Sequence, residues 1–324
     1  MKLYVLKTTD PYLNLAIEEY LFKNCDDSVF ILWQNYNTVV IGKNQNVYCE
    51  VNSEFLKKNN IKVARRITGG GAVYHDLGNI NYSFISKASN KPLDFKTFTE
   101  PIISILRTLG VCAELSGRND IMVGDKKISG NAQFSNGERV LHHGTILFDS
   151  DLSVLSDVLK VDPEKIKNKA IKSTRSRVAN LKGFLQIDIS AAEFMSLLSK
   201  YVVERFGAEM CNIEINDDIS ALAQRNSSSE WIYPERDYLS SYTLKRKKRF
   251  DFGTVEVDIG MSGEDVKGIK IFGDFFGNNP IDELEEKILN NLCKDKTKPL
   301  DKIDIDDYIY GIEEDDFLML LNLS

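Results

Sequence analysis

Three consecutive glycines, Gly69–Gly71, stand between two apolar runs and constrain the fold of this chain more than any other feature. Each glycine loses much backbone entropy on ordering, so a regular helix or strand is not expected there. A sharp bend or the close approach of a ligand would use this freedom, and bare N–H groups can point at an anion. The segment from Lys62 to Ile85 is therefore predicted to be a strand, a glycine turn and a second strand.

Two arginines, Arg65 and Arg66, come just before the glycines. Guanidinium groups are planar, permanently charged donors for phosphate or carboxylate. The segment is not a P-loop, because Gly-Lys-Ser/Thr is missing, and it is not Gly-x-Gly-x-x-Gly before a helix. We interpret it as a cradle for an anionic ligand; the alternative is a hairpin with two solvated arginines.

The composition is that of an ordinary globular protein. The chain has 324 residues, long enough for two domains, with 43% hydrophobic and 27% charged residues. No run reaches the roughly 18–20 apolar residues of a membrane span. The first residues lack a secretory signal pattern, so a cytoplasmic location is expected. Five scattered cysteines without Cys-x-x-Cys favour reduced thiols over disulfides or zinc.

The net charge of −7 argues against a nucleic-acid partner. Residues 160–182 are nevertheless basic, with eight Lys/Arg and two Asp/Glu. Such a segment indicates either a local site for an anion or acidic partner, or a solvated helix face.

The order of expected elements favours an α+β fold with a mixed sheet over alternating βα units. Helical periodicity covers 11–24, after Asp10-Pro11, and recurs from Phe98 to Leu109. Apolar runs at 29–33 and 38–41 are expected to form a hairpin. Further hairpins are predicted at 120–129, around Gly124-Asp125, and at 131–148, around a type I′ turn at Asn136-Gly137.

The C-terminal part is separated by a polar stretch, residues 224–249, which we interpret as a linker and which includes the basic run Lys245–Arg249. Strands at 250–259 and 266–272 and a helix opened by Asn279-Pro280 follow. These patterns predict a large domain over 1–240 and a small one over 241–324.

Lys127 lies in the segment Asp125–Asn131, beside the predicted turn at Gly124-Asp125. If 126–129 is a strand, Lys126 and Lys127 face opposite sides of the sheet, so one can lie under the glycine turn. An ammonium there could meet two anionic groups, although paired lysines at a turn are also typical of a solubilising edge. The histidines His75, His142 and His143 lie near these segments, and we expect hydrogen bonds from them, not a zinc site.

Five motifs together make the chain resemble the lipoate–protein ligases. They occur in the family's order, and the resemblance covers essentially the whole chain. The motifs are Arg65–Asn79 with Arg-Arg-x-x-Gly-Gly-Gly, Gly117–Asp120, Lys127–Ala132, His142–Thr145 and Ser176–Leu181.

The resemblance implies a catalytic domain related to biotin ligases and a small accessory domain that rotates between two steps. Lipoate would react with ATP to form lipoyl-AMP, and a lysine of an apo lipoyl domain or of the glycine-cleavage H protein would then take the lipoyl group. Mg²⁺ would accompany ATP. A monomer without nucleic-acid or membrane partners is expected.

The resemblance also implies roles for individual residues. Lys127 would be catalytic, with Mg²⁺ held mainly by ATP and possibly by Asp120. An apolar slot from strands at 29–41 and 72–85 would hold the lipoate chain, and the loop at 173–181 would cover the adenylate. ATP or adenylate would contact Arg66, Gly71, Ala72, Val73, Tyr74, Lys127, Asp120, Asn79 and Ala179; lipoate would contact Arg65, Gly70, Gly71, His75, Lys127 and His143.

Two other functions fit the same sequence. An octanoyl- or lipoyl-transferase would take its acyl group from a carrier-protein thioester through a cysteine, but no cysteine lies between Cys112 and Cys211. A non-catalytic regulator that binds lipoate or nucleotide would not need Lys127 and Arg66.

Overall fold

A large mixed sheet is the centre of the protein. The computed structural model describes residues 1–88, 93–159, 177–234, 242–263 and 265–321. Eight strands follow the order β11-β1-β2-β6-β10-β9-β8-β7. The β11, β1 and β2 strands run parallel and the other neighbours pair antiparallel, which confirms the predicted mixed sheet. The strands are β1 (Lys2–Val5), β2 (Val29–Trp33), β6 (Asn79–Lys87), β7 (Ala113–Ser116), β8 (Asp120–Val123), β9 (Lys126–Ser135), β10 (Arg139–Leu147) and β11 (Glu209–Cys211).

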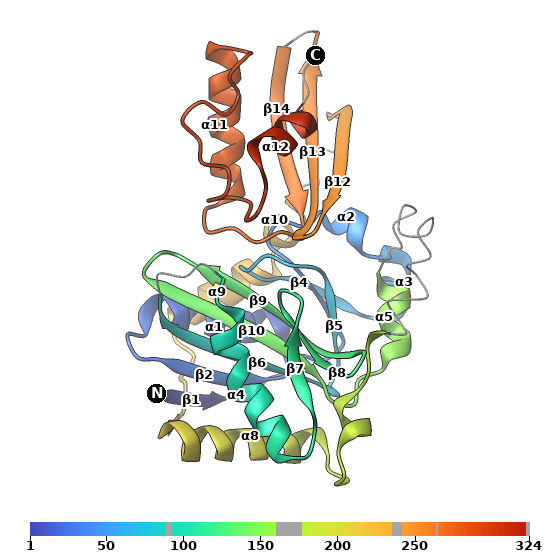
Figure 1. The fold of residues 1–324 in the computed structure, drawn as a ribbon, viewed down its shortest axis with the longest axis vertical. Helices are drawn as coiled ribbons and strands as arrows, with labels where there is room; N and C mark the ends of the chain where they lie inside the picture. Colours follow the sequence, from blue (N-terminus) through green and yellow to red (C-terminus); the bar gives the residue numbers. More distant parts are fainter. Residues whose placement is uncertain (89–92, 160–176, 235–241, 264, 322–324) are drawn as a thin grey trace.

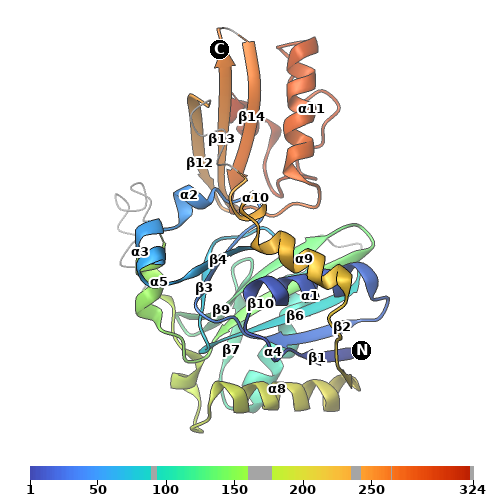
Figure 2. The same ribbon diagram turned by 180° about the vertical axis from the view of Figure 1, so that it is seen from behind.

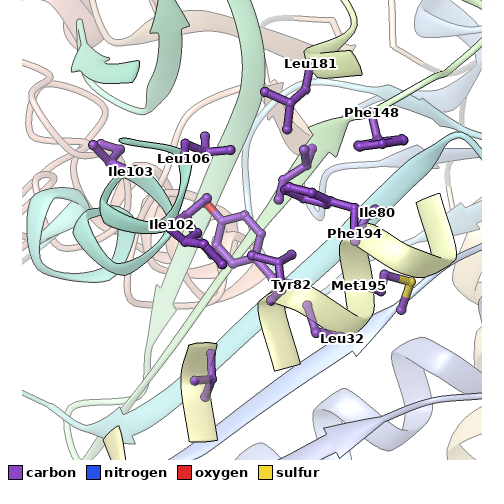
Figure 3. Close-up of a cluster of buried hydrophobic side chains, with 14 of the residues drawn as sticks. Leu32, Ile80, Tyr82, Ile102, Ile103, Leu106, Phe148, Leu181, Phe194 and Met195 are labelled. Carbon is purple, nitrogen blue, oxygen red and sulfur yellow. The ribbon is translucent and has the colours of Figure 1, made fainter. Parts of the chain in front are cut away.

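Helices cover both faces of this sheet. On one face lie α1 (Pro11–Asn24) and α9 (Asp217–Ser227), and on the other lie α4 (Phe95–Thr108) and α8 (Ala191–Phe206) (Figures 1 and 2). Side chains of β6, α4 and α8 meet in the largest buried cluster, which Figure 3 shows around Tyr82. Burying these apolar groups fixes the sheet on which the site is built.

Local signals set the ends of the helices as the sequence indicates. Asp10 accepts hydrogen bonds from the N–H groups of Tyr12 and Leu13 at the start of α1. Ser190 and Glu193 form a capping box on α8, and Gly207 ends that helix with φ of 60°. Shorter helices are α2 (Val47–Glu50), α3 (Ser53–Lys58), α5 (Leu152–Val158), α10 (Ser229–Ile232) and the 3₁₀ turn η1 (Leu181–Phe184).

A second, three-stranded sheet of order β4-β3-β5 packs beside the first. It contains β3 (Thr38–Ile41), β4 (Lys62–Arg65) and β5 (Val73–His75). The predicted hairpin of 29–33 with 38–41 is wrong, because β2 lies in the large sheet and β3 in the small one. Both strands are buried along their whole length. An uninterrupted apolar run lacks the alternation of apolar and polar residues, so the sequence does not indicate which strand it pairs with.

The predicted turns between β8 and β9 and between β9 and β10 are present. Gly124 and Gly137 both have positive φ, 60° and 87°. Asn136 does not, so the second turn is not of type I′, which requires positive φ at both central residues.

The C-terminal part forms a separate sheet and core (Figure 1). Its sheet has the order β12-β13-β14 and is covered by α11 and α12. The basic run Lys245–Arg249 was predicted as linker, but it lies in β12, with Lys245 paired to Asp258 and Lys248 to Asp316. The elements are β12 (Leu244–Phe250), β13 (Gly253–Ser262), β14 (Asp265–Gly273), α11 (Ile281–Lys294) and α12 (Glu314–Leu321).

The C-terminal part packs onto the glycine turn through the segment after β14. The N–H of Gly70 donates to the carbonyl of Phe275 at 3.4 Å. The ring of Phe276 is fully buried, and the Arg118 guanidinium lies 4.3 Å from its centroid. The site is therefore bordered by residues far apart in the sequence.

In the stretches of chain that the structure describes, no helix has both the length and the apolar character needed to cross a membrane.

Candidate active site

A cavity of about 150 Å³ lies between the large and small sheets, next to the glycine turn. It brings together eight of the residues predicted for the site: Arg66, Gly70, Gly71, Ala72, Val73, His75, Lys127 and His143. The other lining residues are Leu15, Trp33, Val40, Asn81, Asn119, Gly130, Asn131, Ala132, Gly144 and Thr145. Residues of the motif Arg65–Asn79 and of the motif Lys127–Ala132, which are far apart in the sequence, thus line the same cavity.

Lys127 reaches this cavity from β9. Its Nζ lies 2.7 Å from Asp120 Oδ1 on the neighbouring strand β8, and both side chains are about one-third exposed (33% and 35%). A Cβ on Gly130 would lie 3.1 Å from Nζ, so glycine there leaves room for the ammonium. Lys126 does not line the cavity and pairs with Asp125, as expected for the opposite side of the strand.

Arg66 holds the glycine turn from inside. Its Nη2 donates to the carbonyls of Gly69 and Gly71 at 2.6 and 2.8 Å, and its Nη1 donates to Val40 at 3.2 Å. A guanidinium has five N–H donors, and Nε also has protein partners, Thr68 and Gly69. Among the described residues, one Nη1 hydrogen therefore has no acceptor.

This clamp orients the peptide groups of the turn. In a trans peptide the N–H points opposite to the preceding carbonyl. Because the carbonyls of Gly69 and Gly71 face the guanidinium, the N–H groups of Gly70 and Ala72 point away from it. Burial lowers the pKa of Arg66 to about 10, and the Glu18 carboxylate opposes that shift, so the group remains charged at neutral pH.

The structure places Arg65, a residue predicted to bind lipoate, outside the cavity. Its guanidinium donates to the carbonyls of Lys43 and Gln45 at 2.8 and 2.7 Å and to Ile232 at 2.8 Å. Neighbouring residues along an extended chain point to opposite sides, so Arg65 cannot share the cavity with Arg66. It instead ties α10 to the loop after β3.

His75 lines the cavity, and one of its ring nitrogens has no hydrogen-bond partner among the described residues. The Asn35 amide, 3.1 Å away, contacts Nδ1, and Nε2 is buried without a hydrogen-bond partner. If the amide donates to Nδ1, the proton is on Nε2. Burial, then the charge of Arg66 and the nearby His143, lower the pKa of His75 to about 3, so the ring is neutral at working pH. Asn81 Nδ2 is a second buried group on this wall without a partner.

Part of the cavity lining is apolar. Leu15 of α1, Trp33 of β2 and Val40 of β3 form this part, and the Trp33 ring meets the edge of His75 at 6.3 Å between centroids. Residues from the segments 29–41 and 72–85, where the apolar slot was expected, thus line the cavity together with Leu15 of α1. An apolar slot with a few polar groups suits an organic ligand with an alkyl portion.

The remaining predicted residues lie beside the cavity, not in its wall. Tyr74 donates from its hydroxyl to Asn37 at 3.0 Å. Asn79 is buried and donates to Asn81 at 2.9 Å. Ala179 donates its N–H to the Lys127 carbonyl at 3.0 Å, so the segment from residue 177 pairs with the lysine strand. Residues 173–176 of the predicted covering loop lie outside the described residues.

Several residues of the site gave no clear sequence signal. Asn81 lines the cavity outside the five motifs, and Phe276 reaches its border from the C-terminal part. Asn119 and Asn131, which also line it, lie inside the motifs Gly117–Asp120 and Lys127–Ala132 but were given no role. Glu18 lies within the predicted helix 11–24, and no role was predicted for it from the sequence. A carboxylate on the buried face of an amphipathic helix is the one signal that could have drawn attention to it.

No group of three His, Cys, Asp or Glu side chains converges in the described portion of the chain. Asp120 is a single carboxylate beside the cavity. That arrangement fits Mg²⁺ that is bound mainly by substrate phosphates and water.

Fold and site together define a class: an enzyme that brings a carboxylic acid with an apolar chain against an anionic second substrate. None of the five cysteines lines the cavity, so the thioester chemistry of a cysteine transferase has no nucleophile there.

Family profiles match both parts of the chain. The profile for the lipoyl protein ligase A/B catalytic domain matches residues 10–203, and that for the bacterial lipoate protein ligase C-terminus matches residues 240–321. Lipoate-protein ligase LplJ of Bacillus subtilis is 39% identical, over 96% of this chain and 97% of the relative. Lipoate–protein ligase 1 of Staphylococcus aureus is 38% identical, over 97% of each chain. The chain belongs to the lipoate–protein ligase family and is an ATP-dependent ligase.

Solved structures agree with this assignment. A Plasmodium falciparum protein, LipL1, in complex with lipoate, has a TM-score of 0.80 and 25% identity, over 99% of both chains. A lipoate-protein ligase A bound with ATP has a TM-score of 0.61 and 32% identity, over 72% of this chain and 98% of that one. The predicted fold, a catalytic domain with a small C-terminal unit, is confirmed.

Proposed function

We propose that this protein activates lipoate with ATP at the cavity between its sheets and transfers the lipoyl group to a lysine of a lipoyl domain. The observation that carries the proposal is the position of Lys127, across one cavity from the glycine turn and from the apolar wall. The expected reaction needs these three features together: a cation, an anion cradle and a slot for an alkyl chain.

Lipoate would lie with its carboxylate at Lys127 and its chain toward Leu15, Trp33 and Val40. The unpartnered Nε2 of His75 supports this use of the cavity, because buried polar groups without a partner are rare in folded proteins. Gly70, Gly71 and His143 complete this wall. Arg65 would act only indirectly, by holding the loop after β3.

The nucleotide would use the backbone of the turn from Gly71 to Tyr74 and the remaining Nη1 hydrogen of Arg66. Asn79 and Ala179 lie next to this region and are proposed to border the adenylate. Mg²⁺ would be held by the phosphates with Asp120 and would shield their negative charge from the incoming carboxylate.

In the first step the lipoate carboxylate oxygen forms a bond to the α-phosphorus, and the bond to the pyrophosphate oxygen breaks. Lys127 can contact both the carboxylate and the α-phosphate, so it stabilises negative charge as the two reactants meet. In the second step the acceptor lysine amine attacks the acyl carbonyl, AMP leaves, and the amine loses a proton. Exclusion of water matters because the mixed anhydride hydrolyses.

An apo lipoyl domain or H protein is the proposed acceptor. One structural neighbour supports this choice: a bi-partite lipoate protein ligase from Thermoplasma acidophilum is described with its E2 lipoyl domain, at a TM-score of 0.63 and 34% identity over 72% of this chain. The proposed division into 1–240 and 241–324 agrees with the C-terminal profile starting at residue 240. We also propose a monomer in the cytoplasm; five free thiols fit a reducing compartment.

The test is a two-stage assay of the purified protein. Lipoate-dependent exchange of labelled pyrophosphate into ATP is expected, followed by mass addition to an apo lipoyl domain and to an apo H protein. Acyl transfer from a carrier protein without exchange would support the transferase. Ligand binding with neither activity would support the regulator.

A further inference from the structure

A chain of hydrogen bonds connects helix α1 to the glycine turn through two residues that do not line the cavity, Glu18 and Thr68. The Glu18 carboxylate lies 3.0 and 3.1 Å from His143 Nδ1. His143 Nε2 lies 2.9 Å from the Thr68 hydroxyl, and Arg66 Nε lies 3.0 Å from the same hydroxyl. The guanidinium then holds the carbonyls of the turn, as described above.

The chemistry of the groups fixes the donor of the bonds at the two ends of this chain. A carboxylate only accepts, so His143 Nδ1 carries the hydrogen of the bond to Glu18. The Thr68 oxygen accepts from Arg66 Nε, which can only donate, and the hydroxyl lies 2.9 Å from His143 Nε2 and 3.4 Å from the Gly69 carbonyl oxygen.

Burial makes that arrangement hard to replace. Glu18, Thr68 and Arg66 are 1%, 0% and 6% exposed. Water cannot substitute for a missing partner at such depth, so a broken bond leaves a buried polar group unsatisfied. The chain also has a charged group at each end, a carboxylate and a guanidinium, and each stabilises the other's charge.

We propose that Glu18 and Thr68 are positioning residues for the glycine turn. They fix the plane of the Arg66 guanidinium, and Arg66 in turn keeps the carbonyls of Gly69 and Gly71 turned inward. This inference rests on the proposed binding of the nucleotide phosphates at the turn. According to this inference, Glu18 of α1 affects the binding of ATP although its side chain does not line the cavity.

A purely structural role would give a different result. Hydrogen bonds that only hold α1 against the sheet would change stability and leave substrate affinities alone. Ser83 offers the control, because its hydroxyl donates to the same Glu18 carboxylate and accepts from Trp33 Nε1 at 2.9 Å, and its removal leaves all three bonds from Glu18 to Arg66 in place.

The experiment measures KM for ATP and for lipoate in the pyrophosphate-exchange assay, with Tm recorded for each variant. Glu18→Gln and Thr68→Val are each expected to raise the KM for ATP about tenfold, the effect of one lost bond of roughly 1.4 kcal/mol. Thr68→Ser keeps the hydroxyl and is expected to restore the wild-type KM. Ser83→Ala is expected to lower Tm with the KM for ATP unchanged.

The double variant Glu18→Gln/Thr68→Val gives the decisive comparison. If both residues act through the same chain of hydrogen bonds, the KM for ATP of the double variant is expected to rise no more than that of the more affected single variant. At independent sites the two effects on the free energy of ATP binding would add. Additive effects, an unchanged KM for ATP in both single variants, or failure of Thr68→Ser to restore it would overturn the inference. If Arg66→Lys also leaves the KM for ATP unchanged, the proposed nucleotide site at the turn is the part that fails.

Discussion

Lys127 and Asp120 form an ion pair, with Nζ and Oδ1 2.7 Å apart, at the edge of the cavity. The cation proposed to bring two anionic substrates together is thus already held by a carboxylate on the adjacent strand. A charged partner reduces the freedom of a long side chain, so the ammonium is oriented before substrates bind. The pair leads to the first two predictions.

Replacing Lys127 by alanine is expected to lower lipoate-dependent pyrophosphate exchange by about 10²–10³-fold, the loss typical of one preorganised charge-stabilising group. Lys126→Ala is the matched control, because the neighbouring lysine faces away from the cavity and should leave exchange near the wild-type rate. Circular dichroism would show that both variants fold. Full activity of Lys127→Ala would remove this residue from the reaction.

Replacing Asp120 by asparagine tests its proposed part in holding Mg²⁺. The change keeps the size of the side chain and removes the charge, so the Mg²⁺ concentration for half-maximal exchange is expected to rise several-fold. Titration of Mg²⁺ at fixed ATP measures this. A lower maximal rate with an unchanged Mg²⁺ midpoint would mean that Asp120 serves only to hold Lys127.

His75 makes the protein less stable in acid. Its pKa is about 3 in the folded protein, mainly because of burial, and about 6.5 when unfolded. Between these values only the unfolded chain binds the proton, so stability is full above pH 6.5 and falls as the pH drops. From pH 7 to pH 5 this group should cost about 2 kcal/mol.

Urea unfolding of the wild type and of His75→Gln at both pH values measures that difference. The variant should lose less stability than the wild type by about this amount. Burial also lowers the pKa of His142, but that group is present in both proteins and cancels. Equal pH slopes for the two proteins would contradict a neutral, buried His75.

Two glycines of the same turn test how the C-terminal part docks. A Cβ on Gly69 would lie 2.2 Å from the carbonyl oxygen of Phe275, whereas a Cβ on Gly71 would meet nothing within 4 Å. Gly69→Ala is therefore expected to push the C-terminal part off the turn and to increase the radius of gyration in X-ray scattering. Gly71→Ala should keep the wild-type scattering curve, and identical curves for both variants would refute this contact.

The sequence predicted much of the site because its motifs are local. Gly69–Gly71 predicted a turn. Because side chains alternate between the two faces of a strand, Lys126 and Lys127 were predicted to point to opposite sides. The same alternation could have warned that Arg65 and Arg66 do not share a cavity. The resemblance gave both arginines a ligand role, and the structure shows Arg65 bound to main-chain carbonyls instead.

Strand partners were harder to predict than strands. The runs at 29–33 and 38–41 are buried along their whole length. Their apolar sequences therefore indicate that the strands are buried but not which strands they pair with. The basic run of β12 suggested a solvated linker because its acidic partners, such as Asp258 and Asp316, come from other strands and helices.

By itself the sequence determined the turn, the lysine strand, the helix caps and the family, because each depends on residues near one another in the chain. Only the tertiary structure decided that two separate sheets enclose the cavity, that Arg66 holds the turn from inside, and that Glu18 reaches it through His143 and Thr68. The physical reason is that a buried polar group must find its partner wherever the chain brings one within hydrogen-bond distance. Glu18 and His143 are 125 residues apart in sequence and 3.0 Å apart in space.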